Sequence, residues 1–302
     1  MRRFPLYLEK GSTSRWNETI KGDAITPENP PQHVRIPVCI YRETGRGPSV
    51  VCIHGSASTS GQWRPLMDRL SDRFRIIAPD LYGHGRTPAW SGSRGMSVDD
   101  ECDLLESVFQ AAGERFHLIG HSWGGAIALK VALRHLPRLL SLTLYEPALW
   151  SLVVAADPES AASREIMVNR DETQCMMDRG EFEAAGEYFV DYWVGSGTWS
   201  TTSEARRAGF AAGMVAARPE WYASFHETTP LAAFAALDVP ALLLTGTKST
   251  APAKRLIALL SPVLPRSRVI TLRDMGHMGP VTHPAQVNKA IEDFLLTISP
   301  TM

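Results

Sequence analysis

The sequence of 302 residues predicts an α/β fold: a mostly parallel central sheet with helices on both faces, and an inserted helical cap. Short apolar segments of strand length alternate with segments of helical periodicity along most of the chain. Several strand-like segments are followed by Gly, His, Asp or Glu, as is typical where a parallel sheet presents functional side chains at the carboxyl ends of its strands. The alternation stops between Pro147 and Pro230, a stretch with helix-like runs and no clear buried strand.

The first part of the chain carries the predicted N-terminal half of the sheet. Residues 1–33 are polar and end in two prolines, so we expect an N-terminal arm there, with room for one edge strand. Residues 49–53 are a fully apolar run of the kind buried in the middle of a parallel sheet, and residues 43–48 are predicted as a turn. We expect further strands at 34–41, 75–78 and 116–120 and helices at 62–70, 98–112 and 126–133.

The rest of the chain is predicted to complete the sheet and to form a cap. The segment 147–230 is rich in aromatic residues and holds helix-like runs at 181–193 and 204–217, which we interpret as a helical insertion over the catalytic edge of the sheet. The core is therefore expected to comprise residues 34–146 and 231–302. Its remaining strands are predicted at 139–145, 241–245 and 268–272, and a closing helix at 285–297.

The composition argues against several classes of partner. Hydrophobic residues make up 44% of the chain and the formal net charge is −1, so nothing favours nucleic acid or a membrane as partner. No continuous apolar segment follows the basic N-terminus, so neither a secretory signal nor a membrane span is predicted. The four cysteines include no Cys-x-x-Cys pair, and we interpret them as free thiols of a reducing, cytoplasmic compartment. Nothing in the sequence indicates an oligomeric state.

The most informative motif is Gly120-His121-Ser122-Trp123-Gly124, which fits the pattern Gly-x-Ser-x-Gly. A strand is predicted just before it and a helix just after it, and this context is that of a nucleophile elbow. Such a turn holds its serine at positive φ, and Gly120 and Gly124 remove Cβ atoms where the strand and the helix crowd each other. The helix N-terminus directs free N–H groups at the serine. We therefore expect Ser122 to be a nucleophile; the alternative is a glycine-rich turn with an inert serine.

Three further segments match one family in the same order. His-Gly-Ser at 54–56 follows a predicted central strand, residues 80–87 read Asp-Leu-Tyr-Gly-His-Gly-Arg-Thr, and residues 276–280 read Gly-His-Met-Gly-Pro. With the Ser122 motif among them, the chain resembles the α/β-hydrolase superfamily over roughly residues 34–298. The resemblance implies a fold and a hydrolytic mechanism. Because the superfamily is broad, it does not define a substrate.

A serine hydroxyl needs a base within hydrogen-bond reach, and the resemblance implies His277. His277 lies between small residues, in the position where the family delivers its catalytic histidine; the alternative is an ordinary core or surface histidine. His54, His84 and His121 lie inside backbone motifs, and we interpret them as structural residues that hold loops by hydrogen bonds. Asp80 is likewise interpreted as part of a tight hydrogen-bonded loop and not as an acid or a ligand.

The acid of the triad departs from the commonest pattern of the family. Many relatives carry an aspartate after the penultimate strand, whereas residues 245–250 of this chain hold no carboxylate. The preceding strand ends in Tyr145 and Glu146, and some members, haloalkane dehalogenase-like enzymes among them, carry the acid at that strand end. We therefore expect Glu146 to orient His277. The alternatives are that Asp274 serves His277 or that no acid does.

The resemblance also implies an oxyanion hole with two N–H donors. Trp123, the residue after the nucleophile, supplies one amide, and Ser56 is expected to supply the other. Dehalogenases of the superfamily have an aspartate where this chain has Ser122, so the serine favours acyl transfer over dehalogenation or epoxide opening. The sequence has no metal-ligand spacing, phosphate loop or dinucleotide fingerprint, and we expect no cofactor and no metal.

Together these residues predict a cofactor-independent serine hydrolase that cleaves a small carboxylic ester or lactone, with an apolar substrate, through an acyl-enzyme. Aromatic side chains of the cap are expected to be divided between the substrate pocket and the packing of the cap itself. They are Tyr188, Phe189, Tyr192, Trp193, Trp199, Trp221, Tyr222 and Phe225.

Three alternative functions stay open at this point. A hydrolase of carbon–carbon bonds in vinylogous diketones would want a buried arginine facing the pocket. A peptidase of short peptides would want an acidic cap residue to bind an amine. A ligand-binding protein would keep the pocket with little turnover. The arginines available in the insertion are Arg164, Arg170, Arg206 and Arg207.

Overall fold

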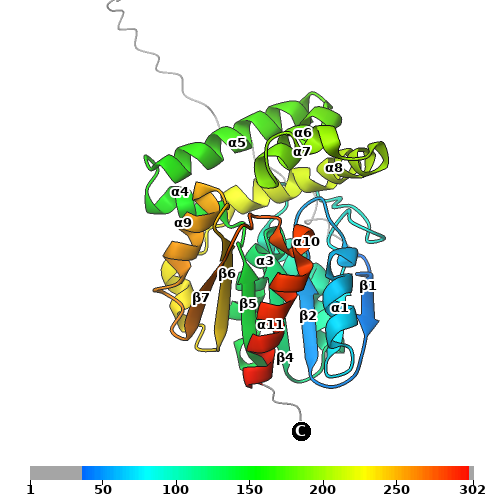
Figure 1. The fold of residues 1–302 in the computed structure, drawn as a ribbon, viewed down its shortest axis with the longest axis vertical. Coiled ribbons are helices and arrows are strands. Elements are labelled where there is room, and N and C mark those ends of the chain that lie inside the picture. The colour runs from blue at the N-terminus through cyan, green and yellow to red at the C-terminus, as the bar shows by residue number, and fades with distance from the viewer. Residues whose placement is uncertain (1–35, 299–302) are drawn as a thin grey trace, which may run out of the picture. The chain divides into compact units, whose positions relative to one another are not determined.

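The computed structural model describes residues 36–298, so the predicted N-terminal arm lies outside the described residues. The strands of this part of the chain form a seven-stranded sheet in the order β1-β3-β2-β4-β5-β6-β7. β1 is antiparallel to β3 and the other neighbouring pairs are parallel, which confirms the predicted mostly parallel sheet (Figure 1). The strands are β1 (Tyr41–Thr44), β2 (Ser49–Ile53), β3 (Arg75–Pro79), β4 (Phe116–His121), β5 (Leu139–Tyr145), β6 (Ala241–Gly246) and β7 (Ser267–Leu272).

Helices cover both faces of the sheet, as predicted. α1 (Arg64–Leu70) and α11 (Pro284–Ile298) pack on one face and share one apolar cluster. α2 (Val98–Ala111) and α3 (Trp123–Arg134) pack together on the other face and belong, with α9 (Ala251–Leu260), to a second cluster. Every residue of β2, β4 and β6 is buried, because side chains from both helical layers shield these strands.

The first strand differs from the prediction. Residues 36–40 are in no regular element, and β1 (Tyr41–Thr44) extends into the segment 43–48 that was predicted as a turn. Pro37, which has no backbone N–H to give to a ladder, lies in the stretch predicted as strand. β1 is an edge strand with mostly exposed residues, so no alternation of apolar and polar residues marks it. Its position is set by its partner β3, which the local sequence does not reveal.

A set of helices is inserted in the sequence between β5 and β6 and lies above the carboxyl ends of the parallel strands (Figure 1). The predicted runs at 181–193 and 204–217 are both helical, and the second continues to His226 with Pro219 inside it. We refer to these helices as the cap. They are α4 (Trp150–Ala156), α5 (Ala161–Asp178), α6 (Phe182–Trp193), α7 (Thr198–Thr201) and α8 (Glu204–His226).

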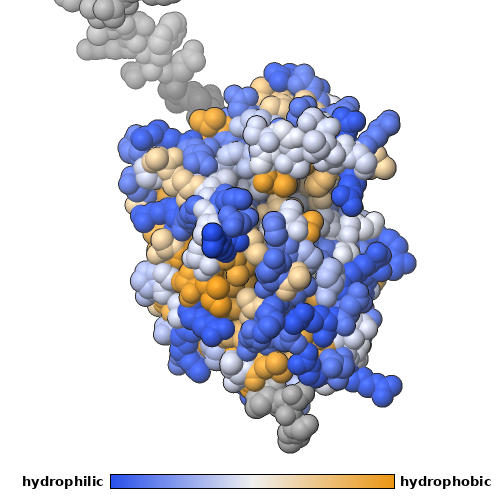
Figure 2. Space-filling view, in the orientation of Figure 1, coloured by the Kyte–Doolittle hydropathy of each residue, from blue (hydrophilic) through white to orange (hydrophobic). Residues whose placement is uncertain are grey.

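The surface in Figure 2 is mostly hydrophilic. Its main hydrophobic area lies over the edge strand β7, where Val269 is 44% exposed. β7 therefore carries apolar side chains at the surface, unlike the buried strands β2 and β4. Among residues 36–298, no helix combines the length and the apolar character needed to cross a membrane.

Candidate active site

Ser122 lies at the sharp turn between β4 and α3, with φ 53° and ψ −120°. Positive φ is uncommon for a residue with a side chain, and the flanking glycines make it possible here. A Cβ atom on Gly120 would lie 2.3 Å from the carbonyl oxygen of Gly124, and one on Gly124 would lie 2.4 Å from that of Ile53. The close packing of strand, turn and helix therefore requires both glycines of the motif.

Three side chains from different segments meet at this turn. His277 Nε2 lies 2.9 Å from Ser122 Oγ, and His277 Nδ1 lies 2.9 Å from Glu146 Oε2. Glu146 follows β5, and His277 lies in the loop after β7. The exposed fractions of Ser122, Glu146 and His277 are 7%, 0% and 2%. In this arrangement Ser122 can pass its proton to one ring nitrogen while the other donates to a carboxylate.

Donors at the end of β6 hold the Glu146 carboxylate. Its Oε1 accepts hydrogen bonds from Thr245 Oγ1 at 2.7 Å, from the Gly246 amide at 3.0 Å and from Ser249 Oγ. Burial alone raises the pKa of this carboxyl, but the interactions with His277 and the two hydroxyls outweigh burial and hold the pKa below its usual range. Glu146 is therefore charged near neutral pH and faces His277 with its other oxygen.

The loop after β6, which lacks the aspartate of many relatives, thus supports an acid on the neighbouring strand. The sequence analysis predicted no role for Ser249. Its position just after β6 could have indicated one, because β5 and β6 are parallel neighbours and the residues that follow them lie close together. The side chain of Asp274, the alternative acid, is 65% exposed and pairs with Lys248 and Arg273 at the surface. Its carboxylate faces these cations and solvent, not His277.

Neighbouring side chains hold the loop that carries His277. Tyr145 Oη donates a hydrogen bond to the Gly276 carbonyl at 2.8 Å, and His121 Nε2 lies 2.9 Å from the His277 carbonyl oxygen. Burial lowers the pKa of His121 to about 3, so its ring is neutral and its N–H can donate to that carbonyl. The indole of Trp193, from α6, covers the imidazole of His277 with ring centroids 4.3 Å apart. The histidine is therefore fixed by contacts from both the sheet and the cap.

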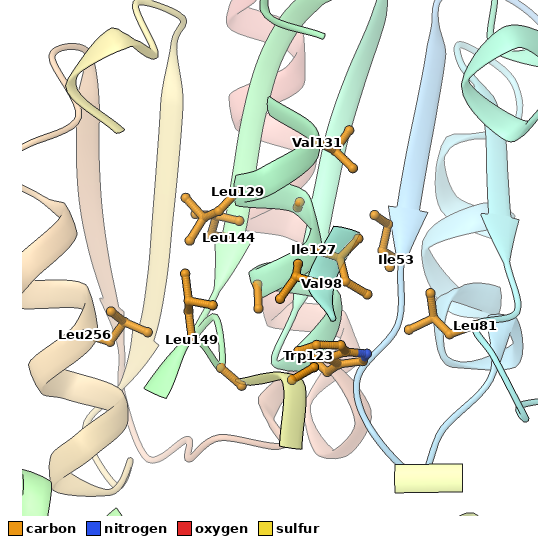
Figure 3. Close-up of a cluster of buried hydrophobic side chains, with 14 of the residues drawn as sticks. Ile53, Leu81, Val98, Trp123, Ile127, Leu129, Val131, Leu144, Leu149 and Leu256 are labelled. Atoms are coloured by element: carbon orange, nitrogen blue, oxygen red, sulfur yellow. The ribbon is translucent and has the colours of Figure 1, made fainter. Parts of the chain in front are cut away.

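The two expected oxyanion donors lie at the same place. Ser56 and Trp123 line a small cavity together with Ser122. Trp123 is the first residue of α3, so its amide has no acceptor in a preceding turn of that helix. Figure 3 shows its indole at the end of a buried apolar cluster, beside Ile127. Ala57, which follows Ser56, has φ 53°, so a second backbone of positive φ lies beside the nucleophile.

This geometry belongs to a known family. A family model described as the alpha/beta hydrolase family matches residues 50–290, which is most of the chain. The chain is an α/β hydrolase. The predicted resemblance and the predicted fold are thereby confirmed, and hydrolysis is the class of reaction.

Individual relatives of this α/β hydrolase carry several hydrolase names. Haloalkane dehalogenase 2 of Mycobacterium tuberculosis is 28% identical over 265 residues, which cover 83% of this chain and 89% of that protein. Pimeloyl-(acyl-carrier protein) methyl ester esterase of Aeromonas hydrophila is 27% identical over 256 residues, which cover 83% of this chain and 96% of that protein. The crystal structure of the enol-lactonase from Burkholderia xenovorans aligns with a TM-score of 0.67 at 20% identity, covering 85% of this chain and 96% of that one. Some matches of higher identity span less than half of the relatives concerned.

Other polar residues of the hydrolase motifs hold loops. His54 Nε2 accepts a hydrogen bond from the Leu81 amide at 3.2 Å. Burial lowers the pKa of His54 to about 3, so its imidazole is neutral. Asp80 accepts hydrogen bonds from the amides of Ser60 at 2.7 Å and Arg86 at 3.4 Å. These contacts are those of structural residues, which is how the sequence was interpreted.

Two buried glutamates, one on the core helix α2 and one on the cap helix α8, had no predicted role. Glu101 on α2 and Glu220 on α8 are 0% and 1% exposed. Glu220 Oε1 lies 2.8 Å from His84 Nε2, and Glu101 Oε2 accepts a long hydrogen bond of 3.4 Å from the Tyr82 amide. Burial, and after it the charge of Glu220, raises the pKa of Glu101 well above its usual range. The raised pKa favours the protonated form of Glu101.

The raised pKa of Glu101 makes the stability of the protein depend on pH. Above pH 4.5 the unfolded chain loses a proton that folded Glu101 keeps, so the free energy of unfolding falls as pH rises toward the folded pKa, by up to about 1.4 kcal/mol per pH unit. Glutamine does not titrate, so in the Glu101→Gln variant this contribution to the fall in the free energy of unfolding is absent. Urea unfolding at a series of pH values above 4.5 should therefore show the variant gaining stability relative to wild type as the pH rises toward the folded pKa of Glu101. Glu114→Gln, at an exposed position, is the control, and its stability relative to wild type should not change with pH. If the stability of Glu101→Gln relative to wild type is also independent of pH, the raised pKa of Glu101 is contradicted.

The space beside Ser122 is small. Its volume is about 20 Å³, which is room for about one water molecule. The cap aromatics were expected to be divided between the substrate pocket and the packing of the cap itself. Trp199 belongs to the packing, because it lies against Gly186 of α6. Besides Trp123, the aromatic residues that line the cavity come from the cap and are Trp150, Phe189, Trp193 and Trp221. The arginines considered for a buried anion site, which are Arg164, Arg170, Arg206 and Arg207, do not line it.

A larger groove, of about 810 Å³, lies beside the triad. Ala57 and Met278, the residues that follow Ser56 and His277, line it, and α6, α7 and α8 supply its other wall. Arg206 is among the lining residues. Within residues 36–298, no group of three or more His, Cys, Asp or Glu side chains is placed to hold a metal ion.

Proposed function

We propose that this α/β hydrolase is a serine hydrolase that cleaves a small carboxylic ester or lactone through an acyl-enzyme. The observation that carries the proposal is the buried series of contacts from Glu146 through His277 to Ser122, with 2.9 Å at each ring nitrogen. A methyl ester esterase and an enol-lactonase among the similar proteins support the same class of substrate.

In the proposed reaction, Ser122 Oγ bonds to the substrate carbonyl carbon while its proton moves to His277 Nε2. The amides of Trp123 and Ser56 donate hydrogen bonds to the oxyanion, and the Glu146 carboxylate stabilises the imidazolium. His277 then gives the proton to the leaving oxygen as the carbon–oxygen bond breaks. Water attacks the acyl-enzyme with His277 as base, and Ser122 leaves with the returned proton.

The surroundings of the triad bear on two of the three alternatives, the carbon–carbon hydrolase and the ligand-binding protein. None of the four cap arginines lines the small cavity beside Ser122, so this cavity offers no cation to the carboxylated diketones of a carbon–carbon hydrolase; Arg206 lines the larger groove instead. The ligand-binding alternative rested on the missing acid after β6, and Glu146 beside His277 removes that reason. This chain has Ser122 at the elbow, whereas the family resemblance implies an aspartate at that position in dehalogenases, so the serine favours acyl transfer.

The test is hydrolysis of a series of p-nitrophenyl esters of increasing acyl length. We expect turnover, with kcat/KM falling at least about 10-fold from butyrate to decanoate, because each added methylene has to enter a cavity of about 20 Å³. Circular dichroism confirms that the sample is folded. Failure of the folded protein to turn over any ester of the series would contradict the proposal.

A further inference from the structure

The indole of Trp221, on the cap helix α8, lies between the cavity beside Ser122 and a second, larger space. This second space, which we call the outer pocket, has a volume of about 460 Å³. Among the described residues, Trp221 is the one that lines both. Tyr222, which also lines the outer pocket, is 46% exposed, so that pocket opens at the surface. A single side chain therefore separates the cavity of the nucleophile from a much larger space. The aromatic residues that line the outer pocket are Trp90, Trp221, Tyr222 and Phe225.

No hydrogen bond holds the indole of Trp221 within the described part of the chain, where its buried Nε1 has no partner. Its ring is stacked on that of Phe225, with centroids 6.0 Å apart. The backbone of α8 is fixed at this point, because Ser224 Oγ donates a hydrogen bond to the Ala148 carbonyl and accepts one from the Trp150 amide. Rotation of the indole toward the outer pocket therefore breaks no hydrogen bond of the ring and needs no movement of the helix.

The other cap aromatics around the cavity have less freedom to move. Trp193 covers the imidazole of His277 and stacks on Trp150, with ring centroids 4.3 and 5.6 Å apart. Trp150, Phe189 and Trp193 do not line the outer pocket. Displacing Trp193 would uncover the histidine of the triad, and the close packing of the cap leaves these rings no adjoining space. The indole of Trp221, in contrast, has the outer pocket next to it.

In the proposed reaction, the acyl part of the ester is directed into the cavity. His277 has to deliver its proton to the leaving group, and Met278, next to it, lines the groove of about 810 Å³. The cavity contains Ser122 and both expected oxyanion donors, Ser56 and Trp123. The leaving group therefore belongs in the groove, and the acyl substituent extends from the carbonyl toward the aromatic wall.

The outer pocket suits an uncharged apolar chain. Its arginines, which are Arg94, Arg170 and Arg218, each pair with an aspartate that offsets the charge. The guanidinium groups of Arg94 and Arg170 also lie over the rings of Trp90 and Phe225, at 5.4 and 5.3 Å from the ring centroids. A chain that enters the pocket thus meets a mostly apolar surface and no unpaired arginine.

We propose that Trp221 is the residue that limits the acyl length of the substrate. This inference rests on the proposed serine hydrolase function. When the indole turns toward the outer pocket, it makes room beside Ser122 for a short acyl chain but stands in the path of a longer one. Without the indole, the cavity and the outer pocket join, and a long uncharged acyl chain can extend from Ser122 to the surface.

The experiment compares p-nitrophenyl butyrate and decanoate with wild type and Trp221→Ala. We expect the ratio of kcat/KM for decanoate to kcat/KM for butyrate to be at least about 10-fold higher in the variant, because the added methylenes gain access to apolar space. Both esters release the same leaving group, so the ratio reports on the acyl part. Trp199→Ala is the matched control, since it removes a buried cap tryptophan that lines neither space. It should change the ratio less than about 2-fold.

Two results would overturn the inference while leaving the proposed function intact. One is an unchanged ratio in active Trp221→Ala enzyme. The other is an equal rise of the ratio in Trp199→Ala, which would indicate that loosening the cap is sufficient. If wild type hydrolyses neither ester and Ser122 is not labelled by a fluorophosphonate, the proposed function fails and the inference with it.

A second variant keeps the inference testable if Trp221→Ala does not fold. Trp221→Leu retains an apolar side chain inside the cap and opens a narrower connection, so it should raise the same ratio at least about 3-fold. A wild-type ratio in folded, active Trp221→Leu enzyme would overturn the inference.

Discussion

Ser122→Ala should lower kcat for ester hydrolysis by about 10³- to 10⁶-fold and abolish labelling by a fluorophosphonate. Without the hydroxyl no acyl-enzyme forms, and what remains is hydrolysis assisted by binding and by the two amides. The loss should appear in kcat and not as an increase in KM, because the hydroxyl is needed for the chemical step. Activity or labelling that persists in purified Ser122→Ala protein would show that another group is the nucleophile.

The same position offers a control on the backbone. Alanine keeps a Cβ atom at φ 53°, whereas glycine has none, so Ser122→Gly should be as inactive as Ser122→Ala but more stable, by on the order of 1 kcal/mol. Urea unfolding of the two variants measures this difference. A glycine variant that is less stable than the alanine variant would show that the turn is not strained.

Glu146→Gln should lower kcat by about 10²- to 10⁴-fold with little change in folding. The amide cannot stabilise the imidazolium, and its NH₂ group, if turned toward His277 Nδ1, selects the wrong tautomer of the ring. The three donors at Oε1 remain available to the amide oxygen, which keeps the side chain in place. Kinetics with p-nitrophenyl butyrate measure the effect.

Asp274→Asn is the matched control for the acid. Its carboxylate is at the surface beside Lys248 and Arg273, so kcat should change by less than about 2-fold. The reverse result, with Asp274→Asn impaired and Glu146→Gln active, would assign the acid to the other residue and contradict the proposed triad.

The features that could be predicted from the sequence are those with a local physical signature. Glycine at 120 and 124 is needed because the strand and helix touch there, and apolar runs such as 49–53 mark buried parallel strands. The position of Glu146 beside His277 could be inferred because neighbouring parallel strands end at one edge. In each case the short-range pattern and the tertiary arrangement agree.

The features that could not be predicted depend on partners distant in sequence. β1 is defined by its pairing with β3, and its own residues are mostly exposed. Glu101 and Glu220 resemble solvent-facing residues of helices when taken alone. Only the docking of α8 on the core brings them together, and helical periodicity carries no information about which helices will meet.

The small cavity at Ser122 has a thermodynamic consequence. In the proposed reaction a carbonyl with even a short acyl chain needs more room than about 20 Å³, so its acyl part could enter the cavity only after aromatic side chains of α6 and α8 had moved away. Conformations open to substrate are then a fraction of the population, and the apparent dissociation constant equals the intrinsic one divided by that fraction. Affinity for substrate thus reports how readily the aromatic wall separates as well as how well the substrate fits once inside.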